Sequence, residues 1–321
     1  MAQGDEVSQR EVSSQEIGIS VTTEFLYLRG NEEGLAYGME TPVSFDLNPY
    51  PYKIIGQEGQ ISPAWGPGAR LTIDYTIPHF DWDAAIIGTY YTTSSSSSLA
   101  APTGGVLWPF WMNGSPGAAA QSASASWAVQ FGTLDLELGG LLQPNPSVQF
   151  RPHFGVRCAW IHQNLNVTYY EAFLTVPLTG VTDHSYNQNN FNGYGVRCGM
   201  DSHWIIARGW SLFVNGALSI LEGFFSLSQK EYASNQLRTD IQNENNEFVT
   251  AAFDLLGGIA WQTSLRQDRY LLGFRLGFES QVWFSQNQLN RFMDDFNHGQ
   301  LISEKGNLSL FGGTFQVNCS F

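Results

Sequence analysis

The strongest constraint on the fold is a strict two-residue alternation of apolar and polar side chains in long segments of the chain. In 269–284 one set of alternating positions is apolar apart from Ser280, and it comprises Leu272, Phe274, Leu276, Phe278, Val282 and Phe284. The final segment, 311–321, alternates in the same way and ends on Phe321. Because successive side chains of a β-strand point to opposite faces, this period predicts strands with one apolar face. Several such segments suit tilted strands that cross a membrane, which need about nine or more residues.

Composition excludes a membrane protein built from helices. A membrane-spanning helix requires about 20 predominantly apolar residues. The one charge-free stretch longer than 18 residues, 84–134, is interrupted throughout by serine, threonine, glycine and proline, and the mean hydropathy is −0.17. The most apolar segment, 205–227, contains Arg208, Asn215 and Glu222 and alternates like a strand. Charged residues make up only 14% of the chain, against roughly 25% in an average soluble domain. The formal net charge of −14, with no basic run, argues against nucleic acid as a partner.

The alternation test yields ten strands separated by connections of alternating length. The predicted strands are 18–29, 65–76, 82–92, 126–139, 148–164, 189–201, 208–228, 247–262, 269–284 and 306–321. Long connections at 30–64, 93–125, 165–188, 229–246 and 285–305 alternate with short ones. Outer-membrane barrels have short periplasmic turns and long extracellular loops. The sequence therefore predicts an all-β, antiparallel transmembrane β-barrel of about ten strands over 18–321, preceded by a flexible polar segment, 1–17.

This architecture predicts the outer membrane of a Gram-negative bacterium as the location. The first residues lack the basic and apolar regions of a signal peptide, so we take the chain to be a mature form. The last strand presents an apolar, lipid-side set that we interpret as the outer-membrane assembly signal: Phe315, Val317, Cys319 and Phe321. Outer-membrane lipid and the barrel-assembly machinery are the partners expected from this signal.

The polar phases of the predicted strands place charges of both signs inside the barrel. The candidate lumen-lining residues are Arg70, Asp74, Arg151, Arg157, Arg197, Asp201, Arg275 and Glu279. In an open pore, such charges would set ion selectivity. In a narrow barrel they would pair and fill the interior, and ten strands lie between the filled eight-strand barrels and the water-filled sixteen-strand ones. Both interpretations remain open at this point.

Aromatic residues near strand ends suit the girdles that mark membrane interfaces. The expected girdle residues are Tyr75, Tyr90, Tyr91, Trp127, Trp160, Trp210, Trp261 and Trp283. Three more aromatics, Trp108, Phe110 and Trp111, stand in the serine-, glycine- and proline-rich connection 93–125. Because large exposed apolar patches are rare, we expect these three to pack into the barrel mouth.

Motifs for catalysis, cofactors or metals are weak or missing. Asp183–His184 and Asp294–Asp295 lie on predicted outer loops and are the candidates for a hydrolase, but solvated loop charge is the better interpretation. His79, in a short turn, is expected to be structural. The three cysteines have no C-x-x-C spacing and fall at apolar strand phases, so we expect them to act as small packing residues. We predict no enzyme activity, no cofactor and no metal.

Several short blocks, in the same order, resemble a known family. They are Glu24–Tyr27 with Gly34–Tyr37, Trp65–Arg70 with Pro78–Asp83, Pro152–Arg157 with Trp160–Ile161, and Phe191–Arg197 with Asp201–Ser202. These blocks are similar to those of the Legionella-type pore-forming major outer membrane proteins, a family also found in chlamydia-related bacteria. The resemblance runs from about residue 20 to the end. It implies a porin-like barrel that passes small hydrophilic solutes and that contacts host cells.

Three functions follow as hypotheses. The first is passive diffusion of small hydrophilic solutes or ions through the barrel, with lumen charges setting preference. The second is a surface-exposed structural or adhesive barrel that acts through its loops, with a host-cell surface or a further copy of the chain as partner. The third-ranked hypothesis is an outer-membrane hydrolase.

Overall fold

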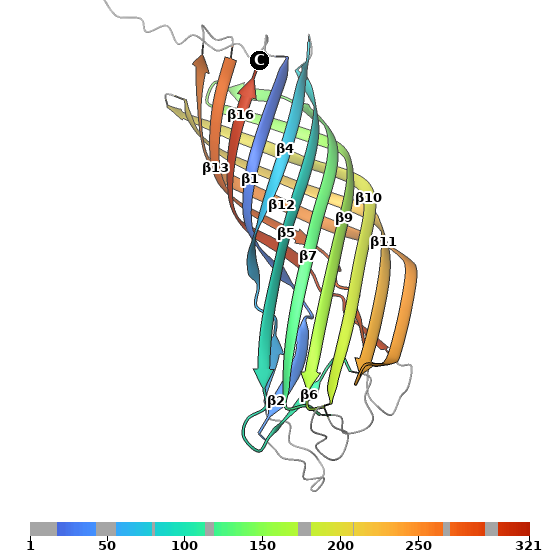
Figure 1. Ribbon diagram of the computed structural model, residues 1–321. Helices are drawn as coiled ribbons and strands as arrows, with labels where there is room; N and C mark the ends of the chain where they lie inside the picture. Colours follow the sequence, from blue (N-terminus) through green and yellow to red (C-terminus); the bar gives the residue numbers. More distant parts are fainter. Residues whose placement is uncertain are drawn as a thin grey trace, which may run out of the picture.

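A computed structural model describes residues 18–42, 56–78, 81–112, 119–172, 181–207, 209–265, 270–292 and 301–321. The segment 1–17 lies outside these ranges. Ten strands of the described chain form one tilted, closed wall (Figure 1). They are β1 (Ile19–Glu32), β4 (Ala64–Ile77), β5 (Trp82–Ala100), β7 (Ser122–Gly140), β9 (Val148–Tyr170), β10 (Thr182–Ala207), β11 (Trp210–Ala233), β12 (Gln236–Leu265), β13 (Tyr270–Trp283) and β16 (Leu308–Ser320). No helix in the described ranges is long and apolar enough to cross a membrane.

The barrel closes where its first and last wall strands, β1 and β16, meet. β16 pairs antiparallel with both β13 and β1, and β9 pairs with β10, so every wall strand has two neighbours. Phe321 donates its N–H to the carbonyl of Ile19 at 2.9 Å, and Ile19 donates its own N–H back to the carbonyl of Phe321 at 3.1 Å. The predicted fold, a closed antiparallel barrel of ten strands, is confirmed. We call the end with Ile19 and Phe321 the terminal end, and the opposite end the distal end.

Six further short strands of the described chain lie outside the ten-strand wall. β8 (Leu142–Asn145) pairs antiparallel with β9 at the terminal end, and β14 (Asn290–Phe292) pairs with β15 (Leu301–Ser303). β2 (Ala36–Thr41), β3 (Gln57–Gln60) and β6 (Val106–Pro109) form a separate three-stranded sheet. Figure 1 shows β2 and β6 at the distal end of the barrel.

All ten predicted strands are present, but much of what was predicted as outer loop is strand. β11 and β12 continue to Ala233 and Gln236, so the expected loop 229–246 is a long hairpin. Its two-residue turn is Ser234–Asn235, both with positive φ (46° and 65°), as a type I′ hairpin turn requires. The expected loops 93–125 and 165–188 shrink in the same way, because β5, β7, β9 and β10 run on past the predicted limits.

The reason for this error is a change of phase within single strands. On β7, Leu134, Leu136 and Leu138 are exposed on the outer surface, whereas Trp127 and Phe131 are buried inside the barrel. On β9, Val156 and Trp160 are outside, and the apolar residues beyond Trp160 are buried inside. Near the terminal end the barrel is therefore apolar outside and polar inside, as in a membrane, while near the distal end it is polar outside and apolar inside, as in water. A test for one continuous apolar phase stops at this inversion.

Candidate functional site

The terminal half of the barrel encloses a polar cavity of about 400 Å³. Its wall combines residues near the terminal opening, such as Ser20, Gln149 and Asn318, with a dense set of charged side chains farther inside. All eight residues predicted to line the lumen are part of this wall: Arg70, Asp74, Arg151, Arg157, Arg197, Asp201, Arg275 and Glu279. Each stands at an inward phase of its strand, because the outward phase in this half is apolar.

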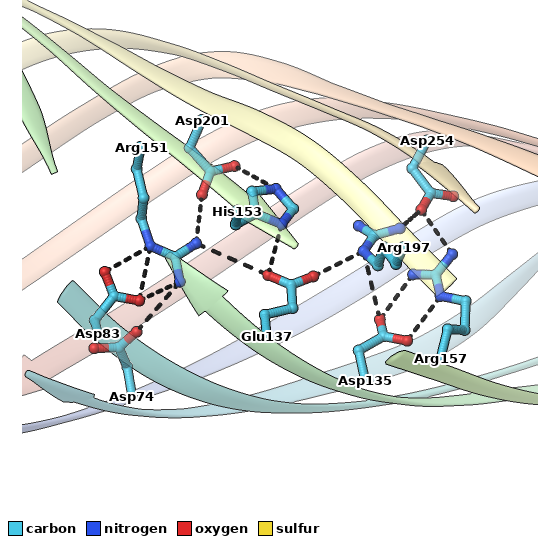
Figure 2. Close-up of polar contacts among 10 residues, drawn as sticks. All are labelled: Asp74, Asp83, Asp135, Glu137, Arg151, His153, Arg157, Arg197, Asp201 and Asp254. Atoms are coloured by element: carbon cyan, nitrogen blue, oxygen red, sulfur yellow. Dashed lines mark hydrogen bonds and ion pairs between the residues drawn. The ribbon is translucent and has the colours of Figure 1, made fainter. Parts of the chain in front are cut away.

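Arg151 connects carboxylates from opposite sides of the cavity wall. Its Nε donates to the two carboxylate oxygens of Asp83 at 2.9 and 2.8 Å, and its Nη1 donates to Asp201 Oδ2 at 3.0 Å (Figure 2). Asp74 Oδ2 lies 3.9 Å from its Nη2, and Glu137 Oε2 lies 3.8 Å from its Nη1. This arginine therefore ties β9 to β4, β5, β7 and β10 across the lumen.

A second cluster surrounds Arg157 and Arg197. Arg157 holds Asp135 with two parallel bonds of 2.7 Å and reaches Asp254 Oδ2 at 2.8 Å. Arg197 donates to Glu137 Oε1 at 2.8 Å and also contacts Asp254 (Figure 2). Because Glu137 lies 3.1 Å from His153 Nδ1 and close to Arg151, it joins the two clusters into one network.

The ion pairs leave an excess of negative charge. In the two joined clusters, the carboxylates of Asp74, Asp83, Asp135, Glu137, Asp201 and Asp254 outnumber the arginines Arg151, Arg157 and Arg197, with His153 beside them (Figure 2). A third cluster adds Arg70, whose Nη1 donates to Glu24 at 2.9 Å and whose Nη2 donates to Glu279. Arg275 instead lies 3.4 Å from His203 Nε2 and 5.3 Å above the Phe213 ring. The excess of carboxylates makes this half of the lumen electronegative.

Sequence reasoning missed the partners of its own candidates. Glu24, Asp83, Asp135, Glu137, His153 and Asp254 all join the charge network. Asp135 and Glu137 alternate with Leu134, Leu136 and Leu138, so their inward phase was readable. Asp254 was placed at the polar phase of its strand but was not selected. Partners across the lumen depend on the pairing register, which a single sequence does not show.

Two pairs of buried aromatic rings lie directly beyond the charges, and we call these four residues the aromatic layer. They are Phe131, Phe191, Phe225 and Trp283, each at most 1% exposed. The Phe131 and Trp283 ring centroids lie 5.2 Å apart, and those of Phe191 and Phe225 lie 4.8 Å apart. Arg157 joins the network to this layer, because its guanidinium lies 5.5 Å above the Trp283 ring.

Two glycines make room for one of these rings. A Cβ atom at Gly193 or Gly223 would come within 2.4 Å of the Phe191 ring. The two residues are directly paired across β10 and β11. The ring therefore lies flat over the wall, at a place that only glycine permits.

Beyond the aromatic layer, an apolar core continues up to the distal sheet, beside buried polar residues of β10 and β11 such as Asp183, Asn187 and Glu231. Leu165, Val167 and Trp127 are buried in it, together with Tyr37 of β2 and Trp111. Tyr169 Oη accepts the N–H groups of Phe110 and Trp111 at 3.2 and 3.1 Å and donates to the carbonyl of Tyr37 at 2.6 Å. The prediction that the aromatics of 93–125 pack into the mouth is confirmed for Trp111, which is completely buried.

The aromatic residues divide between membrane girdle and interior. Tyr75, Tyr90, Trp160 and Trp210 are exposed on the outer surface, as expected for a girdle. Trp261 is partly exposed and stacks on Phe274. The girdle prediction is wrong for Tyr91, Trp127 and Trp283, which point inward and are at most 2% exposed. They lie near or beyond the phase inversion, where inward positions are apolar.

The hydrolase candidates do not assemble into a site in the described residues. Asp183 and His184 are consecutive residues of β10, so Asp183 points inward and is 1% exposed while His184 lies on the outer face. Burial, and secondarily the nearby Glu231 carboxylate, raise the pKa of Asp183 to about 8. Asp294, Asp295 and His79 lie outside the described residues. The described part of the chain also contains no metal-binding group of His, Cys, Asp or Glu.

The cysteines of the described chain do not pack inside the barrel. Cys158, Cys198 and Cys319 are free and exposed. Cys158 stands between the exposed side chains of Val156 and Trp160, so the apolar phase assigned to it is the outer one. The predicted apolar phase is thus the phase on which the three cysteines stand, and in these strand segments it is the outer one.

Comparison with known proteins gives a family match. The family described as Legionella pneumophila major outer membrane protein precursor matches residues 11–321. A search of curated protein sequences found no significant match.

The structural similarities are weaker. The outer membrane protease OmpT from Escherichia coli has a TM-score of 0.39 at 8% identity, covering 97% of this chain and 100% of that one. The translocator domain of the autotransporter NalP from Neisseria meningitidis scores 0.37 at 11% identity, covering 97% and 91%. A Pseudomonas aeruginosa FadL homologue scores 0.24 at 9% identity, covering 95% and 90%. Similarity at these scores supports no functional assignment.

Proposed function

Because this chain belongs to the Legionella major outer membrane protein family and is therefore an outer-membrane protein, we propose that it is a closed, surface-displayed barrel. Its function depends on the distal end, which extends outward from the cell and serves as a structural or adhesive element. The single observation that carries this proposal is the aromatic layer of Phe131, Phe191, Phe225 and Trp283, which fills the lumen with buried side chains of the wall itself.

Two features support a closed barrel over an open pore. The first is that the closure is repeated, since the apolar core continues from the aromatic layer to the distal sheet, where Tyr169 holds Tyr37 and Trp111. The second is that the strands extend far beyond the membrane-facing band; β12 alone has 30 residues, although about nine to eleven suffice to cross a bilayer. A diffusion channel needs no such solid extension, whereas a protein that displays a surface does.

Planar-bilayer recording on the refolded protein tests the proposal. We expect no stepwise conductance from the unsubstituted barrel, once circular dichroism has shown that it is folded. The double variant Phe131→Ala, Trp283→Ala should also fail to conduct, because the apolar core beyond the aromatic layer still fills the lumen. Conductance from this variant, but not from the control Trp210→Ala on the membrane face, would show that the aromatic layer is the whole barrier. Stable, stepwise conductance from the unsubstituted barrel would overturn a closed lumen.

The surface role has its own test. A non-adherent bacterium that displays the barrel should attach to cultured host cells better than the same bacterium with an empty vector. If attachment does not rise, the adhesive form of the proposal is wrong and the structural form remains.

Passive diffusion of small hydrophilic solutes or ions is the second candidate. The charged cavity favours it, because it is polar, opens toward the terminal, periplasmic end and reaches the aromatic layer. Opening would require rings such as Phe131 and Trp283 to rotate away from the lumen. The excess of carboxylates predicts cation preference, and neutralising Arg157 or Arg197 should shift the reversal potential further toward cations. Unchanged reversal potentials in a conducting barrel would mean that these arginines do not line its path.

Hydrolysis is not the function that we propose. A catalytic acid and base must reach the same substrate atom, and Asp183 and His184 lie on opposite faces of one strand.

A further inference from the structure

The outer surface just beyond the membrane-facing band carries no charge over four adjacent strands. The outward residues of 92–98 on β5, 122–130 on β7, 162–170 on β9 and 184–192 on β10 are Ser, Thr, Asn, Gln, Ala, His and Tyr, without any Asp, Glu, Lys or Arg. We call this set the neutral face. It is one continuous surface, because the pairing register places Ser96 beside Ser126, Ser126 beside Asn166 and Asn166 beside Tyr186.

The absence of charge is local. The whole chain has a formal net charge of −14, and the neighbouring β11–β12 hairpin carries exposed charges such as Arg238 and Asp240. Water-exposed protein surfaces ordinarily contain about a quarter or more charged residues. A surface of this size that needed only to be soluble would include some of them.

The neutral face combines hydrogen-bonding groups with exposed aromatic rings. Hydroxyl and amide side chains both donate and accept hydrogen bonds. Tyr186 is 44% exposed, and its ring lies 6.2 Å from His184 and 6.1 Å from Tyr232. Tyr170 is similarly exposed at the distal edge. Tyrosine, serine and asparagine form adaptable binding surfaces, because the rings supply contact area and the small polar groups supply hydrogen bonds.

The position of the neutral face on the barrel indicates which molecules contact it. The same strands carry the lipid-facing residues Leu134, Trp160 and Val196 nearer the terminal end, with no break in pairing between the two regions. Lipids packed on this band therefore present their headgroups at the height of the neutral face. In a bacterial outer leaflet these headgroups are the sugars of lipopolysaccharide.

We propose that the neutral face binds the saccharide portion of the lipopolysaccharide that surrounds the barrel. Neutral hydroxyls and amides match sugar hydroxyls, and the tyrosine rings offer flat apolar surfaces to the C–H faces of sugar rings. Phosphates are not the recognised group, because the neutral face has no arginine or lysine to pair with them. The absence of carboxylates also avoids repulsion by an anionic leaflet.

The test compares two purified glycolipids on the folded barrel: lipopolysaccharide with its complete core sugars, and lipid A, which lacks them. Binding is measured by calorimetry in detergent. We expect at least tenfold tighter binding of the form with core sugars. The triple variant Ser126→Asp, Asn166→Asp, Tyr186→Ala should lose that preference while it still binds lipid A. Tyr194→Ala is the matched control, because Tyr194 is exposed on the same strand within the membrane-facing band. It should keep the preference.

Three outcomes would overturn the proposal. One is equal affinity of the unsubstituted barrel for the two glycolipids. Another is a preference that survives the triple variant, with circular dichroism showing that the variant is folded. The third is a triple variant that changes sedimentation behaviour but not glycolipid binding, which would make the neutral face a contact between copies of the chain. Free core oligosaccharide should bind more weakly than the lipid-anchored form, and stronger binding of the free form would exclude the outer leaflet as the source.

Discussion

At the scale of residues, the interior of this barrel shows what a buried charge requires. Arg157 has a side chain only 6% exposed, and its guanidinium is matched by Asp135 and Asp254. Its inward phase was predictable from the alternation of Val156, Cys158 and Trp160. Its partners were not, since Asp254 is 97 residues away in the sequence. A residue's face follows from local chemistry, whereas its ion pair follows from the fold.

We predict that Arg157→Leu lowers the free energy of unfolding by about 3–5 kcal/mol, because it removes the paired cation of buried Asp135 and leaves Asp254 with Arg197 alone. Urea unfolding in lipid vesicles measures the effect. Lys230→Leu is the control, since the Lys230–Asp240 pair is exposed at 3.8 Å and such pairs contribute about 0–1 kcal/mol. Equal losses from the two substitutions would show that the Arg157 network does not stabilise the barrel.

The raised pKa of Asp183 predicts that the stability of the distal end, which lies outside the membrane, depends on pH. Its pKa is about 8 in the folded protein, above its ordinary value of 3.8. The folded state therefore binds the extra proton, and stability falls as pH rises from about 4 to about 8. Glu231 contributes to the raised pKa, and Arg238 opposes it.

The unfolding temperature measured between pH 4 and pH 9 checks this prediction. Asp183→Asn should flatten the decline, because the amide does not ionise. Asp240→Asn, at an exposed position, should leave the decline as it is in the unsubstituted chain. A steep decline retained by Asp183→Asn would mean that another group causes it.

At the scale of elements, the strands were predictable and their lengths were not. The lipid-facing alternation on β10, through Tyr194, Val196 and Met200, located the strand correctly. The alternation stops near the phase inversion, so the predicted strand starts at residue 189, whereas β10 itself begins at Thr182. Beyond the inversion, inward residues such as Asn187 and Asn189 are polar, and so are their outward neighbours. The sequence therefore shows no apolar–polar alternation there. Only pairing with β9 and β11 shows that this stretch is strand.

The β11–β12 hairpin gives a prediction at this scale. Its turn residues Ser234 and Asn235 both have positive φ, a conformation that glycine adopts without strain and β-branched residues resist. Asn235→Gly should leave stability unchanged or raise it slightly, and Ser234→Val should lower it by about 1–2 kcal/mol. Hydrogen exchange of the distal hairpin amides reports the local opening. Faster exchange in Asn235→Gly than in Ser234→Val would contradict the type I′ turn.

At the scale of the whole molecule, Phe321 extends the seam that closes the barrel. The backbone of Phe321 exchanges two hydrogen bonds with Ile19, and its ring is half-exposed on the lipid side. The assembly signal of Phe315, Val317, Cys319 and Phe321 stays a prediction, and the structure places all four on the outer phase of β16 or just after it.

We predict that Phe321→Ser sharply lowers the amount of folded barrel recovered from outer membranes. Phe284→Ser is the control, because Phe284 is exposed to a similar degree but does not end the chain. Resistance of the folded barrel to unfolding by detergent at room temperature measures the yield. Equal yields from the two variants would mean that the terminal position of Phe321 has no special role.

The sequence by itself determined the class of the barrel, the number and order of its strands, and the face on which each charged candidate stands. These properties follow from a period of two, which every residue reports through its immediate neighbours. The tertiary structure decided which side chains meet inside the barrel. Phe131, Phe191, Phe225 and Trp283 come from four strands spread over much of the chain, and the fold packs them as ring pairs within one buried core. Pairing register and interior packing are properties of the closed sheet, so the packing on which the proposed closure rests became visible only in three dimensions.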